Sequence, residues 1–198
     1  MKVALTGSSG LIGSNLISFL SKKDVTVSKI LRENPEDKKV SWKPESGDWD
    51  SAFAGGIAGI VHLAGENIAS GKWTRKKKEK IRNSRIEGTR RLCEHILKLP
   101  TPPSVFVCAS AIGYYGNRGM EFLNEISSRG TGFLPDVCLG WEEATESVSK
   151  AGIRVVNLRF GIALSKDGGA LPKMMTPFKI GMGGKAGSGT QYMSWVDI

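Results

Sequence analysis

A glycine pattern near the start of the chain is the clearest sign of chemistry. Residues 6–13 read Thr-Gly-Ser-Ser-Gly-Leu-Ile-Gly and directly follow the apolar run Val-Ala-Leu. Gly7 would permit a tight turn, Gly10 the approach of a diphosphate to the backbone, and Gly13 close packing of the next helix on the strand. The N-terminus of such a helix offers unpaired amides and a partial positive charge to phosphates. We therefore predict a dinucleotide site bordered by Gly7, Ser9, Gly10, Leu11, Ile12 and Gly13.

The end of the second predicted strand bears on which dinucleotide is bound. The strand covers residues 25–31, and Arg32 and Glu33 follow it. A guanidinium at this position can form charge-assisted hydrogen bonds to the 2′-phosphate of NADP, whereas a carboxylate would accept hydrogen bonds from the ribose of NAD. Arg32 therefore favours NADP, and Glu33 keeps NAD as the alternative.

The elements that position these residues follow from the apolar pattern. Near-continuous apolar runs at 57–63 and 105–109 are typical of parallel strands buried on both faces, and a further strand is predicted at 153–158. Helical spacing predicts helices that begin at the glycine turn, at residue 74 and at residue 133, the last two reaching residues 99 and 150. This alternation of strands and helices predicts an α/β, Rossmann-like doubly wound parallel sheet.

His62, Leu63 and Ala64 end the central predicted strand at its carboxyl edge. Cofactors lie at this edge in open α/β sheets, so we expect the backbone here to border the dinucleotide. For the side chain of His62 we favour a packed histidine at the end of a strand over a proton donor.

Composition places the chain among globular proteins and excludes several classes. The 198 residues are 40% hydrophobic and 24% charged, and they contain no apolar run long enough for a membrane span. Cys93, Cys108 and Cys138 are widely spaced without a C-x-x-C pair, which favours reduced thiols in a cytoplasmic protein over a metal site. The net charge of +9 owes much to residues 75–80, which we interpret as the solvated start of a helix because no nucleic-acid-binding motif accompanies them.

Several further segments carry a resemblance to a known family. The chain resembles the extended short-chain dehydrogenases/reductases, and among them the epimerase family of NADP-dependent sugar-nucleotide epimerases and oxidoreductases. The matching segments are residues 6–13, 62–68, 84–85, 88–89, 110–116, 138, 141–142, 168–171, 177–179 and 187–195. Members of that family continue for about another hundred residues, so the resemblance implies that a C-terminal substrate lobe is largely absent.

The resemblance also implies roles for individual residues. Ser110 matches the hydroxyl that the superfamily places after a central strand to bond the reacting oxygen of the substrate, although a turn-forming serine is the alternative. Arg85 matches a position near the nicotinamide-side ribose, with a role on the helix surface as the alternative. Arg159 and the glycine-rich stretch 181–189 would border the substrate cleft.

One element of the superfamily pattern is missing. The helix predicted from residue 133 carries neither the tyrosine nor the lysine of the usual Tyr-x-x-x-Lys pair, in which the ammonium lowers the pKa of the phenol. Tyr114 reproduces the spacing with Arg118, but on a loop, and Tyr115 resembles a structural tyrosine before a glycine. Tyr114 and Tyr115 remain the candidate acids beside Ser110.

Two functions therefore stay open. The first is an NADP-dependent oxidoreductase or epimerase that transfers hydride at a carbinol carbon of a small-molecule substrate, such as a nucleotide sugar. The second is a catalytically impaired NADP-binding sensor or interaction module. In either case residues 1–198 form an NAD(P)-binding domain, with residues 161–198 as the start of the substrate-cleft segment, and an oligomer is compatible with both.

Overall fold

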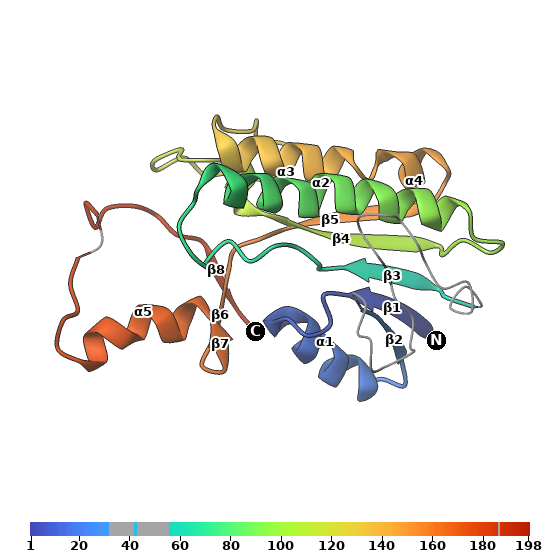
Figure 1. Ribbon diagram of the computed structural model, residues 1–198, viewed down its shortest axis with the longest axis horizontal. Helices are drawn as coiled ribbons and strands as arrows, with labels where there is room; N and C mark the ends of the chain where they lie inside the picture. Colours follow the sequence, from blue (N-terminus) through green and yellow to red (C-terminus); the bar gives the residue numbers. More distant parts are fainter. Residues whose placement is uncertain (32–41, 43–55, 186) are drawn as a thin grey trace.

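The computed structural model describes residues 1–31, 42, 56–185 and 187–198. Its centre is a five-stranded parallel sheet in the order β2-β1-β3-β4-β5. The strands are β1 (Lys2–Thr6), β2 (Thr26–Ile30), β3 (Gly59–His62), β4 (Val105–Ala111) and β5 (Arg154–Phe160). Figure 1 shows α1 (Leu11–Ser21) on one face, and α2 (Arg75–Leu97), α3 (Phe133–Glu143) and α4 (Glu146–Lys150) on the other. The predicted doubly wound α/β fold is confirmed.

The charges at the start of the long helix α2 are unfavourable for a helix N-terminus. Its first turn holds basic side chains and no acidic one, which opposes the helix dipole. The start is fixed instead by Thr74, whose Oγ1 accepts a hydrogen bond from the amide of Lys77 at 3.2 Å. The helix ends at Leu97, shortly before Pro100, within two residues of the predicted end.

Two predicted boundaries were wrong. The helix expected over 133–150 is divided into α3 and α4, where Thr145 Oγ1 donates a hydrogen bond to the carbonyl of Glu142 at 2.7 Å and competes with the helical pattern. The strand expected over 105–109 ends later, because β4 continues to Ala111 and pairs with β5 along seven residues. Ser110 therefore lies on a strand, and the short 3-10 helix η2 (Ile112–Tyr114) follows it.

The core lies between the sheet and the helices α2 and α3. Ile60 of β3, Phe106 of β4 and Leu92 of α2 have no exposed surface, and Trp141 of α3 packs into the same cluster. Fully burying an aliphatic or aromatic side chain of this size contributes about 1.5–3 kcal/mol each. This packing fixes α3 relative to the end of β4, where the candidate site is found.

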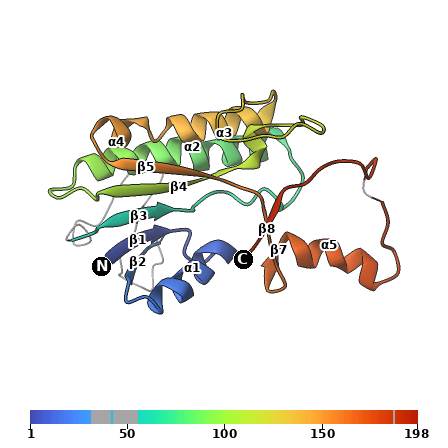
Figure 2. The ribbon, with the colours of Figure 1, turned by 180° about the vertical axis from the view of Figure 1, so that it is seen from behind.

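The C-terminal segment leaves the main sheet. Strands β6 (Ile162–Ser165), β7 (Gly168–Gly169) and β8 (Trp195–Asp197) form a second sheet in the order β7-β6-β8, and α5 (Ala170–Lys179) extends from it (Figure 2). This segment exposes large apolar side chains, among them Met174, Phe178, Met182 and Trp195. That residues 161–198 begin a substrate-cleft segment stays a prediction.

Three findings concern membrane spans, metal sites and the state of the cysteines. Over the described ranges, no helix combines the length and the apolar character needed to cross a membrane. In the same part of the chain, no three residues of the His, Cys, Asp and Glu types are grouped as metal ligands would be. The three cysteines are free and buried.

Candidate functional site

Two glycines of the turn between β1 and α1 leave no room for a side chain. Gly7 has a φ of +69°, and a Cβ on it would come within 2.8 Å of the carbonyl oxygen of Leu63. A Cβ on Gly13 would lie 2.3 Å from the carbonyl oxygen of Gly7. Gly13 thus lets the helix close on the turn itself rather than on the strand. Both positions require glycine for the backbone to keep this shape.

Gly10 differs from these two glycines. Its φ of −76° and ψ of 167° are ordinary extended values, and a Cβ there would stand 3.3 Å from the carbonyl oxygen of Gly7. The fold therefore tolerates a side chain at this position far better. Glycine at residue 10 matters for what approaches from outside the turn, as an oxygen-rich diphosphate would.

The first turn of α1 is open to an anion. Gly10 is its N-cap residue, and no side chain among the described residues caps it or places a carboxylate in the first turn. The first amides of a helix have no partner within the helix, so those of Leu11, Ile12 and Gly13 are available to an acceptor. The β6–β7 hairpin lies beside this turn, since a Cβ on Gly169 would come within 2.9 Å of Leu11 Cδ2. The geometry fits the diphosphate of a dinucleotide.

At the neighbouring end of β3, a buried polar chain fixes the backbone. Thr6 Oγ1 accepts hydrogen bonds from the amides of Leu63 and Ala64 at 3.1 and 3.2 Å, and it lies 2.7 Å from His62 Nδ1. His62 Nε2 lies 3.0 Å from Thr89 Oγ1. Because the Thr6 oxygen already accepts twice, its own hydrogen goes to Nδ1, which places the ring proton on Nε2.

His62 is fully buried, and burial lowers its pKa to about 3. Its ring packs against those of Phe106 and Trp42. The interpretation of His62 as a packed histidine agrees with this arrangement. The backbone of residues 63 and 64 is the part that meets the glycine turn, through the contact of Gly7 with Leu63.

Arg85 of α2 holds the segment that follows β3. Its Nη1 donates to the carbonyls of Glu66 and Ile81 at 3.0 and 3.3 Å, and its guanidinium lies over the ring of Trp141. Burial lowers the pKa of Arg85, while Cys138 and Glu66 oppose that change. The expected contact of Arg85 with the cofactor stays a prediction. Arg32 lies outside the described residues.

Ser110 belongs to a charged cluster at the carboxyl end of β4. Its Oγ, almost fully buried, donates a hydrogen bond of 2.6 Å to Glu142 Oε1 on α3. Arg159, directly opposite Ser110 in the β4–β5 register, binds the same carboxylate through Nε–Oε1 at 2.9 Å and Nη2–Oε2 at 2.8 Å. The side chains of Arg159 and Glu142 are only 17% and 15% exposed, so water screens this bidentate pair weakly.

The two candidate tyrosines contact Arg159. Tyr115 accepts a hydrogen bond from Arg159 Nη1 at 3.0 Å and donates one to the carbonyl of Asn124 at 2.9 Å. The guanidinium carbon lies 3.6 Å from the centre of the Tyr114 ring. The hydrogen bond to Glu142 raises the pKa of Arg159 the most, and burial opposes it, so the guanidinium stays cationic.

Glu142 was expected only as part of the family resemblance, and no role was predicted for it. A signal was available: Ser110 and Arg159 end adjacent strands, and Glu142 follows a tryptophan on the helix expected to cover them. Cys138, one helical turn earlier, is buried, which raises the pKa of its thiol to about 11 with a further contribution from Glu142.

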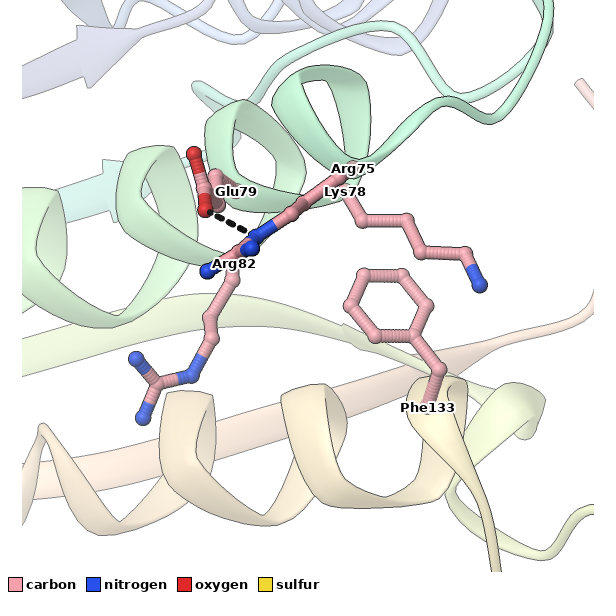
Figure 3. A pocket seen from close by; sticks show the side chains of 5 residues that line it. All are labelled: Arg75, Lys78, Glu79, Arg82 and Phe133. Carbon is pink, nitrogen blue, oxygen red and sulfur yellow. Dashed lines mark hydrogen bonds and ion pairs between the residues drawn. The ribbon is translucent and has the colours of Figure 1, made fainter.

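A separate hollow of about 340 Å³ lies where α2 faces the start of α3. Arg75, Lys78, Glu79, Arg82 and Phe133 line it, with Lys78 extending beside the Phe133 ring (Figure 3). None of the predicted site residues contributes to it.

A five-stranded parallel sheet with an open glycine turn after its first strand defines a Rossmann-type dinucleotide-binding domain. The sequence model of the NAD dependent epimerase/dehydratase family matches residues 3–198, and the chain belongs to this family. The recognised resemblance is thereby confirmed.

Related proteins agree with this assignment. An epimerase family protein of Mycobacterium bovis is 41% identical over 197 residues, which are 99% of this chain and 65% of that protein. One from Staphylococcus aureus is 35% identical, over 98% of this chain and 66% of the relative. The chain thus spans about two thirds of the length of these relatives.

Solved structures show the same arrangement. The nucleoside-diphosphate sugar epimerase from Corynebacterium glutamicum matches all of this chain and 41% of its own, with a TM-score of 0.85 and 39% identity. The human epimerase family protein SDR39U1 with NADPH matches all of this chain and 66% of its own, with a TM-score of 0.85 and 29% identity. A Bacillus cereus UDP-glucuronic acid 4-epimerase in complex with its nucleotide sugar and NAD, at 16% identity and a TM-score of 0.77, shares the fold.

Proposed function

We propose that this chain binds NADP(H) over the Gly7–Gly13 turn and serves hydride transfer at a carbinol carbon of a nucleotide sugar. The observation that carries the proposal is the turn itself, where two glycines leave no room for a side chain and no side chain among the described residues caps the start of α1. A bound nicotinamide cofactor would supply the group that accepts or donates the hydride.

The residues proposed to hold the cofactor surround the ends of β1, β2 and β3. The amides of Leu11, Ile12 and Gly13 would bind the diphosphate, with Ser9 and Gly10 at its edge. The backbone of His62, Leu63 and Ala64 would border the rest of the dinucleotide, and Arg85 would bind on the nicotinamide side. Arg32 would contact the 2′-phosphate.

The substrate class is supported by the relatives. The Corynebacterium protein is named a nucleoside-diphosphate sugar epimerase, and the human relative was solved with NADPH. Ser110 would face the reacting oxygen, with Tyr114 and Tyr115 as the candidate acids. Buried free thiols at all three cysteines support a cytoplasmic location as part of the same proposal.

Cofactor titrations of the full-length protein test this function. We expect NADPH to bind more tightly than NADH, and Arg32→Ala to weaken NADPH about ten- to a hundredfold with little effect on NADH, because a charge-assisted bond to phosphate contributes roughly 1.5–3 kcal/mol. Equal losses for the two cofactors would remove Arg32 from the phosphate site. The hydride step is tested by incubating the holoenzyme with a panel of nucleotide sugars and following the absorbance of the reduced nicotinamide.

One observation favours the alternative of a catalytically impaired module. The hydroxyl of Tyr115 is engaged by Arg159 and by the carbonyl of Asn124, and α3 carries neither tyrosine nor lysine. Binding of NADPH without hydride transfer to any member of the panel would select this alternative.

A further inference from the structure

We propose that Glu142 is the proton-accepting partner of Ser110, and that the two together move the proton of a substrate hydroxyl. This inference rests on the proposed hydride-transfer function and adds to it a residue that the Tyr-x-x-x-Lys pattern does not contain. The substrate it implies is a secondary alcohol whose oxygen lies against the carboxyl end of β4.

The direction of the Ser110 hydrogen bond sets what the serine offers to a substrate. An ionised carboxylate only accepts hydrogen bonds, so the hydrogen of Ser110 Oγ points at Glu142 Oε1, 2.6 Å away. That distance is typical of a charge-assisted O–H···O⁻ bond. The lone pairs of the Ser110 oxygen are then left to accept the hydrogen of an alcohol. A serine without such a partner would be free to turn its hydrogen either way.

The carboxylate is held still by Arg159. The guanidinium binds both of its oxygens, while Nη1 is fixed by the hydroxyl of Tyr115 and the carbonyl of Glu125, at 3.0 and 3.1 Å. Tyr114 covers the flat face of the same group. A carboxylate clamped in this way keeps Oε1 aimed at Ser110, which positions it for proton transfer at little further entropic cost.

Two other proton-transfer groups at this sheet edge, Tyr115 and His62, are already engaged. The hydrogen of the Tyr115 hydroxyl is bound by a backbone carbonyl, and His62 is fully buried with both ring nitrogens hydrogen-bonded. Using either would first require a buried hydrogen bond to break. Ser110 already donates a short hydrogen bond to Glu142 along the line of the proposed proton transfer.

Proton and hydride leave the substrate together. As the carbinol C–H bond breaks, its electron pair would leave with the hydrogen as hydride, and a bound oxidised nicotinamide would supply the acceptor. The substrate O–H proton passes to Ser110 Oγ as the serine proton passes to Glu142 Oε1, and the carbinol becomes a carbonyl. Loss of the carboxylate charge weakens the pair with Arg159, so the protonated carboxyl is the less stable state and gives its proton back readily. This suits a reaction that returns the proton when hydride returns to the carbonyl.

Glu142→Gln in the full-length holoenzyme tests the inference, with Glu143→Gln as the control because Glu143 is exposed on the next position of α3. Ser110→Ala is the second variant, since it leaves the Glu142–Arg159 pair intact, and Ser110→Thr should restore the hydroxyl. We expect hydride transfer to fall about 10²–10⁴-fold in Glu142→Gln and Ser110→Ala, to stay near wild type in Glu143→Gln, and to recover in Ser110→Thr part of what Ser110→Ala loses. NADPH affinity should stay within about twofold of wild type in all four, because the diphosphate is expected at the backbone of α1.

An infrared readout separates proton transfer from a merely structural role. Addition of substrate to wild type with oxidised cofactor should produce a protonated-carboxyl band that Glu142→Gln lacks. Wild-type transfer rates in Glu142→Gln, or persistence of the band there, would overturn the role of Glu142 while leaving the proposed function standing. NADPH binding without transfer by wild type would overturn the hydride-transfer function and this inference together.

Discussion

The glycine turn (Gly7–Gly13) and the cluster of Ser110, Glu142 and Arg159, called here the corner, lie at the same edge of one sheet but are built in opposite ways. The turn keeps its shape only where residues have no side chain, because a Cβ at Gly7 or Gly13 would collide with the backbone. The corner depends on its side chains, because Arg159 holds Glu142 in a bidentate pair and Ser110 donates a hydrogen bond to the same carboxylate. A substitution therefore disrupts the turn by adding atoms, and it disrupts the corner by removing a side chain or neutralising its charge.

The largest expected effect comes from adding atoms where the fold tolerates them. Gly10→Val should weaken NADPH binding at least about a hundredfold, because a branched side chain would stand where the diphosphate is expected while the extended backbone keeps its shape. Fluorescence titration measures the affinity, and circular dichroism should show an unchanged fold. Gly184→Val is the matched control, since a Cβ there meets open space. Unchanged affinity in Gly10→Val would place the diphosphate elsewhere.

The buried chain beside the turn should make stability depend on pH. The pKa of His62 is about 3 in the folded protein and about 6.5 when unfolded, so the unfolded state binds the additional proton between these values. The free energy of unfolding should therefore fall as the pH drops below 6.5, by about 1.4 kcal/mol per pH unit from this group. Urea unfolding of wild type and His62→Asn at pH 6.5 and 4.5 measures this. The same pH dependence in both proteins would refute the assignment.

Removing a charge should break the corner without touching the turn. Arg159→Met leaves the carboxylate of Glu142 partly buried and unpaired, so we expect a loss of about 2 kcal/mol in the free energy of unfolding, between the values for exposed and fully buried pairs. Lys150→Met breaks the exposed pair with Glu146 and should cost less than about 0.5 kcal/mol. Equal losses in the two variants would show that the corner is no more than a surface ion pair.

The smallest effects distinguish the two tyrosines. Tyr115→Phe leaves Arg159 Nη1 and the carbonyl of Asn124 each short of a partner, so it should cost about 1 kcal/mol in thermal or urea unfolding. Tyr114→Phe keeps the ring over the guanidinium and should stay within about 0.5 kcal/mol of wild type. Loss of hydride transfer in either variant, with NADPH still bound, would identify that phenol as the acid and displace Ser110 and Glu142 from the role.

The two regions also differ in how far sequence could predict them. The turn is local: strand, glycines and helix follow one another within residues 3–21, so spacing alone was sufficient. The corner joins residues 110, 142 and 159, which meet only because β4 and β5 pair and α3 packs on them. Spacing in the sequence could place Ser110 and Arg159 at the ends of strands, but it could not predict that the side chain of Glu142 points toward them.

Element boundaries failed for a related reason. The end of β4 was expected too early because Ser110 reads as a loop residue when its partner on β5 is unknown. The break between α3 and α4 depends on one side-chain hydrogen bond of Thr145 to a carbonyl three residues earlier. Such bonds compete with the helix at energies too small for propensity to predict.

The hydroxyl of Thr6 has a consequence for how this part of the protein opens. It accepts hydrogen bonds from the amides of Leu63 and Ala64 and is hydrogen-bonded to His62, which in turn is hydrogen-bonded to Thr89. One chain of hydrogen bonds thus connects β1, β3 and α2. These amides can exchange with deuterated water only when β1 separates from β3, and that separation also strips the buried imidazole of a partner. Residues 63 and 64 should therefore exchange together with the core strands, as one cooperative unit, although they lie at the edge where the cofactor is expected.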